Sequence, residues 1–200
     1  MTGDFQRAAG IAAIAAGVAG FLYSVAFVLL TRVAGGGATA AYSALLLLGG
    51  LLSSFALVGL WERQRMVSPG LALWALAVGL FGALGAAIHG GFDLANVITA
   101  PPRLILEAAN PVDPRGMLTF GFAGLAVGAF SFLMQRSGAW PRTLVYLGFA
   151  SAILLIVIYL LRLLIPNSSA VLAPAALEGF VVNPVWYVWL GLELRRVPVA

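Results

Sequence analysis

The sequence predicts an all-α protein, a polytopic transmembrane bundle of six spanning helices in a single domain. Hydrophobic residues make up 62% of the 200-residue chain and charged residues only 9%, and the mean hydropathy is +1.03. Soluble domains carry about 25% charged residues, so this chain lacks the polar groups to cover its own surface in water. Its apolar runs reach the ~20 residues that a helix needs to cross a bilayer. Lipid is therefore the expected solvent for most of the chain.

The charged residues argue for membrane topology and against nucleic acid as a partner. All eleven basic residues are arginines, and they stand near the ends of the predicted helices rather than on one face. The chain has no cysteine, which excludes disulfides, thiolate nucleophiles and Cys-ligated metals. The expected partners are membrane lipids and, within an assembly, other membrane protein subunits. No cofactor is expected.

The first predicted helix covers residues 8–30. A secretory signal is the rival interpretation, but its apolar core should be only about 7–15 residues long, so we expect a retained helix. Residues 31–37, which include three consecutive glycines, predict a tight turn. The second helix is expected at 38–61, where Trp61 would anchor the membrane interface.

Two later helices begin with a capping residue followed by proline. Ser68-Pro69 and Asp113-Pro114 each combine an N-cap side chain with a proline suited to the first helical turn. Between them, Arg103 to Glu107 predicts a short amphipathic helix at the interface. The remaining expected helices cover residues 69–97, 114–134, 141–165 and 173–194.

The arginines also predict the orientation. Six helices with short connections place seven arginines at one end of the bundle and four at the other. The richer end should be cytoplasmic, so both termini are expected in the cytoplasm and the protein in the inner membrane of a cell. The richer end holds Arg7, Arg63, Arg65, Arg136, Arg142, Arg195 and Arg196, and the other holds Arg32, Arg103, Arg115 and Arg162.

Ionisable residues within spanning helices are costly and by default mark functional sites. His89, the only histidine, lies roughly 30 Å along the third helix at 1.5 Å per residue, which is near its outward end. Asp93 and Asn96 share its helix face. Arg162 and Glu178 fall near the outward ends of the fifth and sixth helices. The predicted polar site at the outer boundary therefore comprises His89, Asp93, Asn96, Arg162 and Glu178.

Each of these residues has a simpler interpretation beside the functional one. In the simpler interpretation, His89 and Asp93 satisfy each other's hydrogen bonds. In the functional one, they relay protons, hold a metal or bind a lipid headgroup. A transition metal is the weaker choice, because the chain has one histidine and no cysteine. Arg162 extends to the interface or pairs with an acid. Glu178 is a favourable charge near a helix N-terminus or part of a buried pair. Asn183-Pro184 is a supported kink or a break that faces a substrate.

Four segments are similar to a group of bacterial multi-helix membrane proteins of unknown function, mainly from high-G+C lineages. They read GFLYSVAF at 20–27, HGGFDLAN at 89–96, NPVDPRG at 110–116 and NPVWY at 183–187. The resemblance implies an integral membrane protein and carries no catalytic residue to this chain.

The sequence leaves three functional hypotheses open. The first is an accessory or scaffold subunit of a membrane assembly, suggested by short loops and small-residue helix faces. The alternative is a small transporter or proton-coupled carrier with a polar site at the outer leaflet. The second alternative is a lipid-modifying enzyme, although no nucleotide-binding, zinc-protease or hydrolase motif is recognisable and no catalytic residue is assigned.

Overall fold

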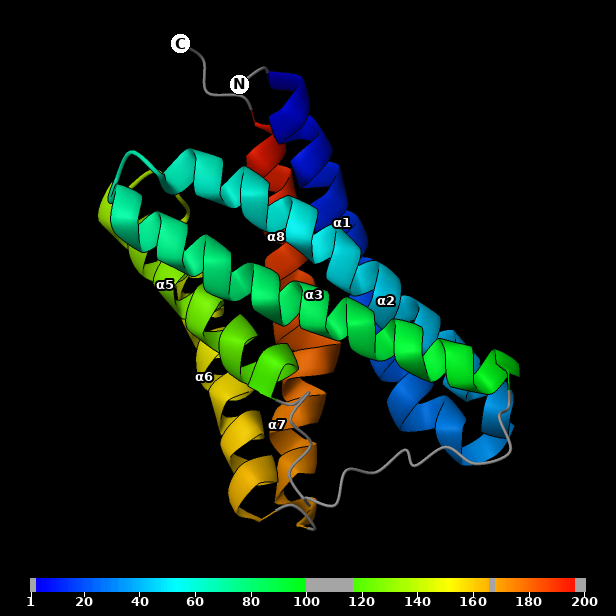
Figure 1. Ribbon diagram of the computed structural model, residues 1–200. Helices are drawn as coiled ribbons and strands as arrows, with labels where there is room; N and C mark the ends of the chain where they lie inside the picture. Colours follow the sequence, from blue (N-terminus) through cyan, green and yellow to red (C-terminus); the bar gives the residue numbers. More distant parts are fainter. Residues whose placement is uncertain (1–2, 100–116, 166–167, 197–200) are drawn as a thin grey trace.

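The computed structural model describes residues 3–99, 117–165 and 168–196 (Figure 1). These residues contain no strand and form six long helical stretches, which confirms the predicted all-α helical bundle. Five of the stretches are long and apolar enough to cross a membrane by length and composition, as expected of a multi-pass membrane protein. The short helix predicted at Arg103–Glu107 and the cap predicted at Asp113 lie outside the described residues.

Three of the stretches contain a π-helical segment, designated η1, η2 and η4; η3 is a single 3₁₀ turn. In chain order the elements are α1 Gly3–Val25, η1 Ala26–Leu30, α2 Thr31–Gln64, α3 Pro69–Thr99, η2 Met117–Phe122, α5 Ala123–Ser137, α6 Arg142–Leu164, η3 Ser169–Val171, α7 Leu172–Leu177, η4 Glu178–Val182 and α8 Asn183–Arg195.

Most helix ends agree with the sequence, but the predicted turn at residues 31–37 is wrong. This segment is helical and α2 begins at Thr31, directly after η1. Glycine weakens a helix in water, yet within a bilayer the backbone has to satisfy its own hydrogen bonds, which keeps the segment helical. Tyr42 of α2 nevertheless contacts the rings of Tyr23 and Phe27, so the chain still reverses direction between α1 and α2.

The two ends of the bundle differ in shape. Both termini lie together at one end (Figure 1). Toward the opposite end, α1, α2 and α3 diverge from α6 and α7 in this view. Large apolar side chains such as Ile88 and Phe81 point outward and are 73% and 63% exposed. Such side chains suit a hydrocarbon environment.

Small residues set the distances between neighbouring helices. The predicted close-packing positions of α3 (Gly79, Gly82, Ala83, Gly85 and Ala86) are all buried. A Cβ atom at Gly90 would lie 2.5 Å from Ser43 O and from Leu47 N, so α2 and α3 touch through their backbones there. α1 and α8 meet in the same way, because a Cβ at Gly10 would lie 2.6 Å from Gly191 O. Close contacts of this kind are the usual basis of helix association in membranes.

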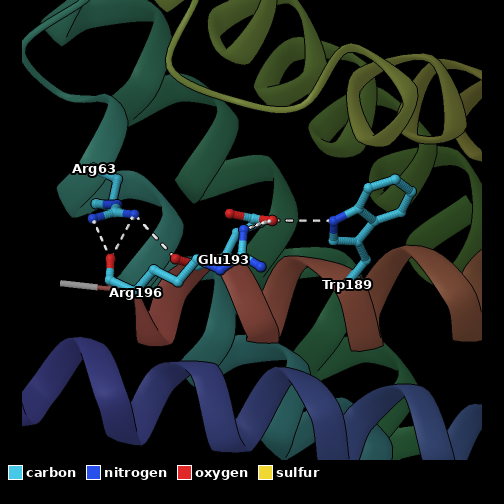
Figure 2. A network of polar contacts seen from close by, with 4 residues as sticks. All are labelled: Arg63, Trp189, Glu193 and Arg196. Atoms are coloured by element: carbon cyan, nitrogen blue, oxygen red, sulfur yellow. Dashed lines mark hydrogen bonds and ion pairs between the residues drawn. The ribbon is translucent and has the colours of Figure 1, made fainter. Parts of the chain in front are cut away.

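A polar network holds the end of the bundle at which the termini lie (Figure 2). Arg63 of α2 donates to the backbone oxygens of Glu193, at 3.1 Å, and Arg196, at 3.4 Å. Glu193 Oε1 accepts from Trp189 Nε1 at 3.1 Å and from Arg196 Nη1 at 2.8 Å. The guanidinium of Arg63 also lies over the Trp140 ring, 5.5 Å from its centroid. Arg63, which the sequence analysis placed only among the arginines of the richer end, therefore satisfies carbonyls that the end of α8 leaves free.

Candidate functional site

A cavity of about 360 Å³ lies inside the bundle and is lined by residues of all six helical stretches. Its wall is mostly apolar, with glycine and alanine from α2, α3, α5 and α7. Cavities of this size are typical of small-molecule sites, in which a few polar groups fix the orientation of a ligand. The polar side chains on the lining are those of Tyr23, Ser24, Ser53, Thr119, Glu178, Asn183 and Tyr187.

Glu178 supplies the carboxylate of this cavity. Its side chain is buried, with 4% of its surface exposed. Ser151 of α6 donates a 2.5 Å hydrogen bond to its Oε1 atom. The Asn183 side chain interacts with the same carboxyl, but Oε2 makes no hydrogen bond of normal geometry within the described residues. No arginine or histidine is among the described residues on the lining, so Glu178 has no basic partner there.

The backbone at Glu178 is π-helical because of the proline that follows. Pro184 has no N–H to donate, and its ring would collide with the carbonyl four residues earlier in a regular helix. In η4 the N–H of Asn183 instead bonds Glu178 O, five residues back. The kink predicted at Asn183-Pro184 thus takes the form of a π segment, and Glu178 stands at its start.

All three π segments contribute to the cavity wall. η1 provides Phe27 and Val28, η2 provides Thr119 and Phe120, and η4 provides Glu178 and Gly179. Thr119 Oγ1, like Glu178 Oε2, is buried without a hydrogen-bond partner among the described residues. π-helical turns are rare and occur frequently at functional sites. Their gathering around one cavity therefore favours this cavity as the functional site.

Aromatic residues stand at one side of the cavity. Tyr23 and Phe27 stack with their ring centroids 5.7 Å apart, and the Tyr42 ring lies edge-on to both. Tyr23 interacts electrostatically with Asp93 of α3 and with Arg162 of α6. Tyr23 therefore lies near enough to two of the polar residues that the sequence singled out for their charges to act on its hydroxyl.

The predicted polar site is divided between the cavity and its surroundings. Of its five residues, only Glu178 lines the cavity. His89 Nε2 and Asp93 Oδ2 lie 3.1 Å apart on α3, with each side chain 20% exposed. Asn96 is half-buried, and its Nδ2 atom has no hydrogen-bond partner among the described residues. Arg162 is exposed and lies over the Phe120 ring, 5.8 Å from its centroid.

Comparison of the chain with protein-family models, curated proteins and solved structures found no match. The geometry of the cavity therefore provides the evidence about function. Within the described residues, no three potential histidine, cysteine or carboxylate ligands lie together to hold a metal ion.

Sequence reasoning missed several residues of this site. The residues that were not predicted as part of the site are Ser151, Tyr23, Ser53 and Tyr187. The last two interact with each other across α2 and α8. Hydroxyl groups within apolar spans are common, so the sequence offers no signal that separates these from the rest. Asn183 was recognised, but as support for a kink rather than as a neighbour of Glu178.

Proposed function

We propose that the protein is a proton-coupled carrier of small apolar cations, which bind in the central cavity with their charge beside Glu178. The observation that supports this role is a buried carboxylate, one oxygen of which forms no hydrogen bond among the described residues, in a mostly apolar chamber. An ionised carboxylate in such surroundings is costly unless a cation compensates it. A ligand with an apolar body and a positive charge fits both the wall and the acid.

Glu178 would bind either the substrate or a proton. A bound cation neutralises the carboxylate, and so does a proton at Oε2, but both cannot occupy the same oxygen. Entry of the substrate then releases one proton, and return of the proton releases the substrate. The groups that face this carboxylate are Ser151 from α6 and Asn183 from α8, with the phenols of Tyr23 and Tyr187 on the same lining.

The scaffold hypothesis receives less support from the geometry. It was suggested by small-residue helix faces, and those of α3 pack inside the chain against α2 and α5 rather than remaining free for another subunit. The lipid-modifying enzyme has no supporting observation at the cavity, whose described lining carries a single carboxylate and no histidine. Both stay as alternatives to the carrier.

The orientation belongs to the same proposal. Arg7, Arg136, Arg142, Arg195 and Arg196 stand at the end of the bundle that carries the termini. The positive-inside rule places this end in the cytoplasm and the protein in the inner membrane. The widely separated ends of α3 and α6 would then face outward, and the cavity would load from that side.

The test is binding of tetraphenylphosphonium, a lipophilic cation, to the detergent-purified full chain by titration calorimetry. The wild-type chain should bind it with release of a proton, detected as a heat that depends on the ionisation enthalpy of the buffer. Glu178→Gln keeps the shape of the side chain and should weaken binding by about tenfold or more, because each lost charge contact is worth about 1.5–3 kcal/mol.

The matched control is Asp4→Asn, which removes a carboxylate from the exposed start of α1. It should bind the cation like the wild type. Equal binding by the wild type and Glu178→Gln, with both eluting as intact folded protein, would refute the proposed role of the cavity.

A further inference from the structure

We infer that the end of the α1–α8 pair carries a separate site for a phosphate group, presented by an anionic phospholipid. Arg7 of α1 and Arg195 and Arg196 of α8 line a hollow of about 250 Å³ together with Leu192. The hollow lies at the end of the bundle that holds both termini, away from the Glu178 cavity.

Glycine packing brings these arginines together. A Cβ atom at Gly10 would lie 2.5 Å from Arg195 Cγ, so the stem of Arg195 crosses α1 directly over this glycine. Arg7 is one turn before Gly10 on the same helix. The close approach of α1 and α8 thus places two guanidinium groups from different helices beside one hollow.

The hollow keeps a net positive charge within the described residues. Arg196 is paired, because its Nη1 atom lies 2.8 Å from Glu193 Oε1. Arg7 and Arg195 form no ion pair with a described carboxylate, although Asp4 stands one turn from Arg7 on α1. Two uncompensated cations remain, and guanidinium groups bind phosphate oxygens through paired hydrogen bonds.

Apolar side chains continue from the hollow into the hydrocarbon region. Ile11 follows Arg7 by one turn and is 58% exposed, and Val18 continues the same face of α1 at 49%. On α8, Leu192 borders the hollow at 46% exposed, and Val185 lies two turns further at 47%. A ligand bound in the hollow contacts the arginines with its charged group and the apolar side chains with the rest of its structure. This arrangement suits a phospholipid rather than a soluble polyanion.

Native mass spectrometry of the full chain in detergent, with phosphatidylglycerol or phosphatidylcholine of identical acyl chains, tests this site. We expect the wild type to retain phosphatidylglycerol in preference. The double variant Arg7→Gln/Arg195→Gln should bind it about tenfold or more weakly. The matched control Arg136→Gln/Arg142→Gln removes two exposed arginines from the same end, at α5 and α6, and should retain the lipid like the wild type.

Three outcomes overturn the inference: equal retention of the two lipids by the wild type, equal losses in the two double variants, or unchanged binding by Arg7→Gln/Arg195→Gln. A further arm adds inorganic phosphate alone and follows thermal stability. Stabilisation by free phosphate equal to that by phosphatidylglycerol would assign the site to a soluble anion and reject the lipid.

Discussion

Ser151 and Glu178 form a hydrogen bond of 2.5 Å between α6 and the π segment η4, with both side chains buried. This contact joins the last two helical stretches of the chain and fixes one oxygen of the cavity's carboxylate. The other oxygen forms no hydrogen bond among the described residues. The bond therefore positions Glu178 without occupying it.

Ser151→Ala should destabilise the protein by about 1–3 kcal/mol, because it leaves a buried carboxylate oxygen without its donor. Thermal unfolding in detergent, followed by tryptophan fluorescence, measures the change. Ser54→Ala is the control, since Ser54 only donates to Leu51 O within its own helix. Similar melting temperatures for the two variants would show that the Ser151 bond contributes nothing to stability.

Gly90→Ala should loosen the contact between α2 and α3. The added methyl would meet Ser43 O and Leu47 N, which belong to backbone that cannot rotate away. The expected cost is about 1–3 kcal/mol, as for other overpacked positions. Gly70→Ala has nothing within 4 Å of the added Cβ and should leave unfolding unchanged or raise stability slightly. A melting temperature of Gly90→Ala at or above that of Gly70→Ala would contradict the close packing.

Arg63→Gln should release the end of α8. It removes the donors to Glu193 O and Arg196 O, so the last turn of α8 opens more often and exposes its amides to exchange. We expect hydrogen exchange over residues 189–196 to accelerate by about tenfold, equivalent to one charged hydrogen bond of roughly 1.5 kcal/mol. Arg65→Gln, whose ion pair with Glu62 lies within one helical segment, should leave this exchange unchanged. Identical exchange in both variants would show that the Arg63 hydrogen bonds do not stabilise the end of α8.

The orientation can be tested with single cysteines, because the chain has none of its own. Ala139 and Ser169 are exposed and lie beyond opposite ends of α6. A membrane-impermeant maleimide should label Ser169→Cys in intact cells, and Ala139→Cys only after lysis. The reverse pattern would invert the proposed topology, and equal labelling of both positions in intact cells would argue against a spanning α6.

The composition and the spacing of apolar runs were sufficient to predict the helical bundle. Hydrocarbon requires every backbone group to bond within its own helix, so long apolar runs leave few alternatives to helices. The proline starts and arginine ends then located most helix boundaries to within a few residues. The i,i+4 spacing of His89 and Asp93 also predicted that the two side chains share one helix face, where the structure holds Nε2 and Oδ2 3.1 Å apart.

The location of the cavity was decided by tertiary structure alone. Helices that are apolar on every side carry no periodic signal to say which face points inward, because lipid and protein core are chemically alike. Glu178 could be singled out as a costly charge, but its partner Ser151 is 27 residues away, and their contact depends on how α6 and η4 rotate and tilt. The sequence marked this acid as out of place and left open whether it is a charge near a helix N-terminus or part of a buried pair. Only the packing of the six helical stretches brought it the hydrogen bond from Ser151 and an open chamber.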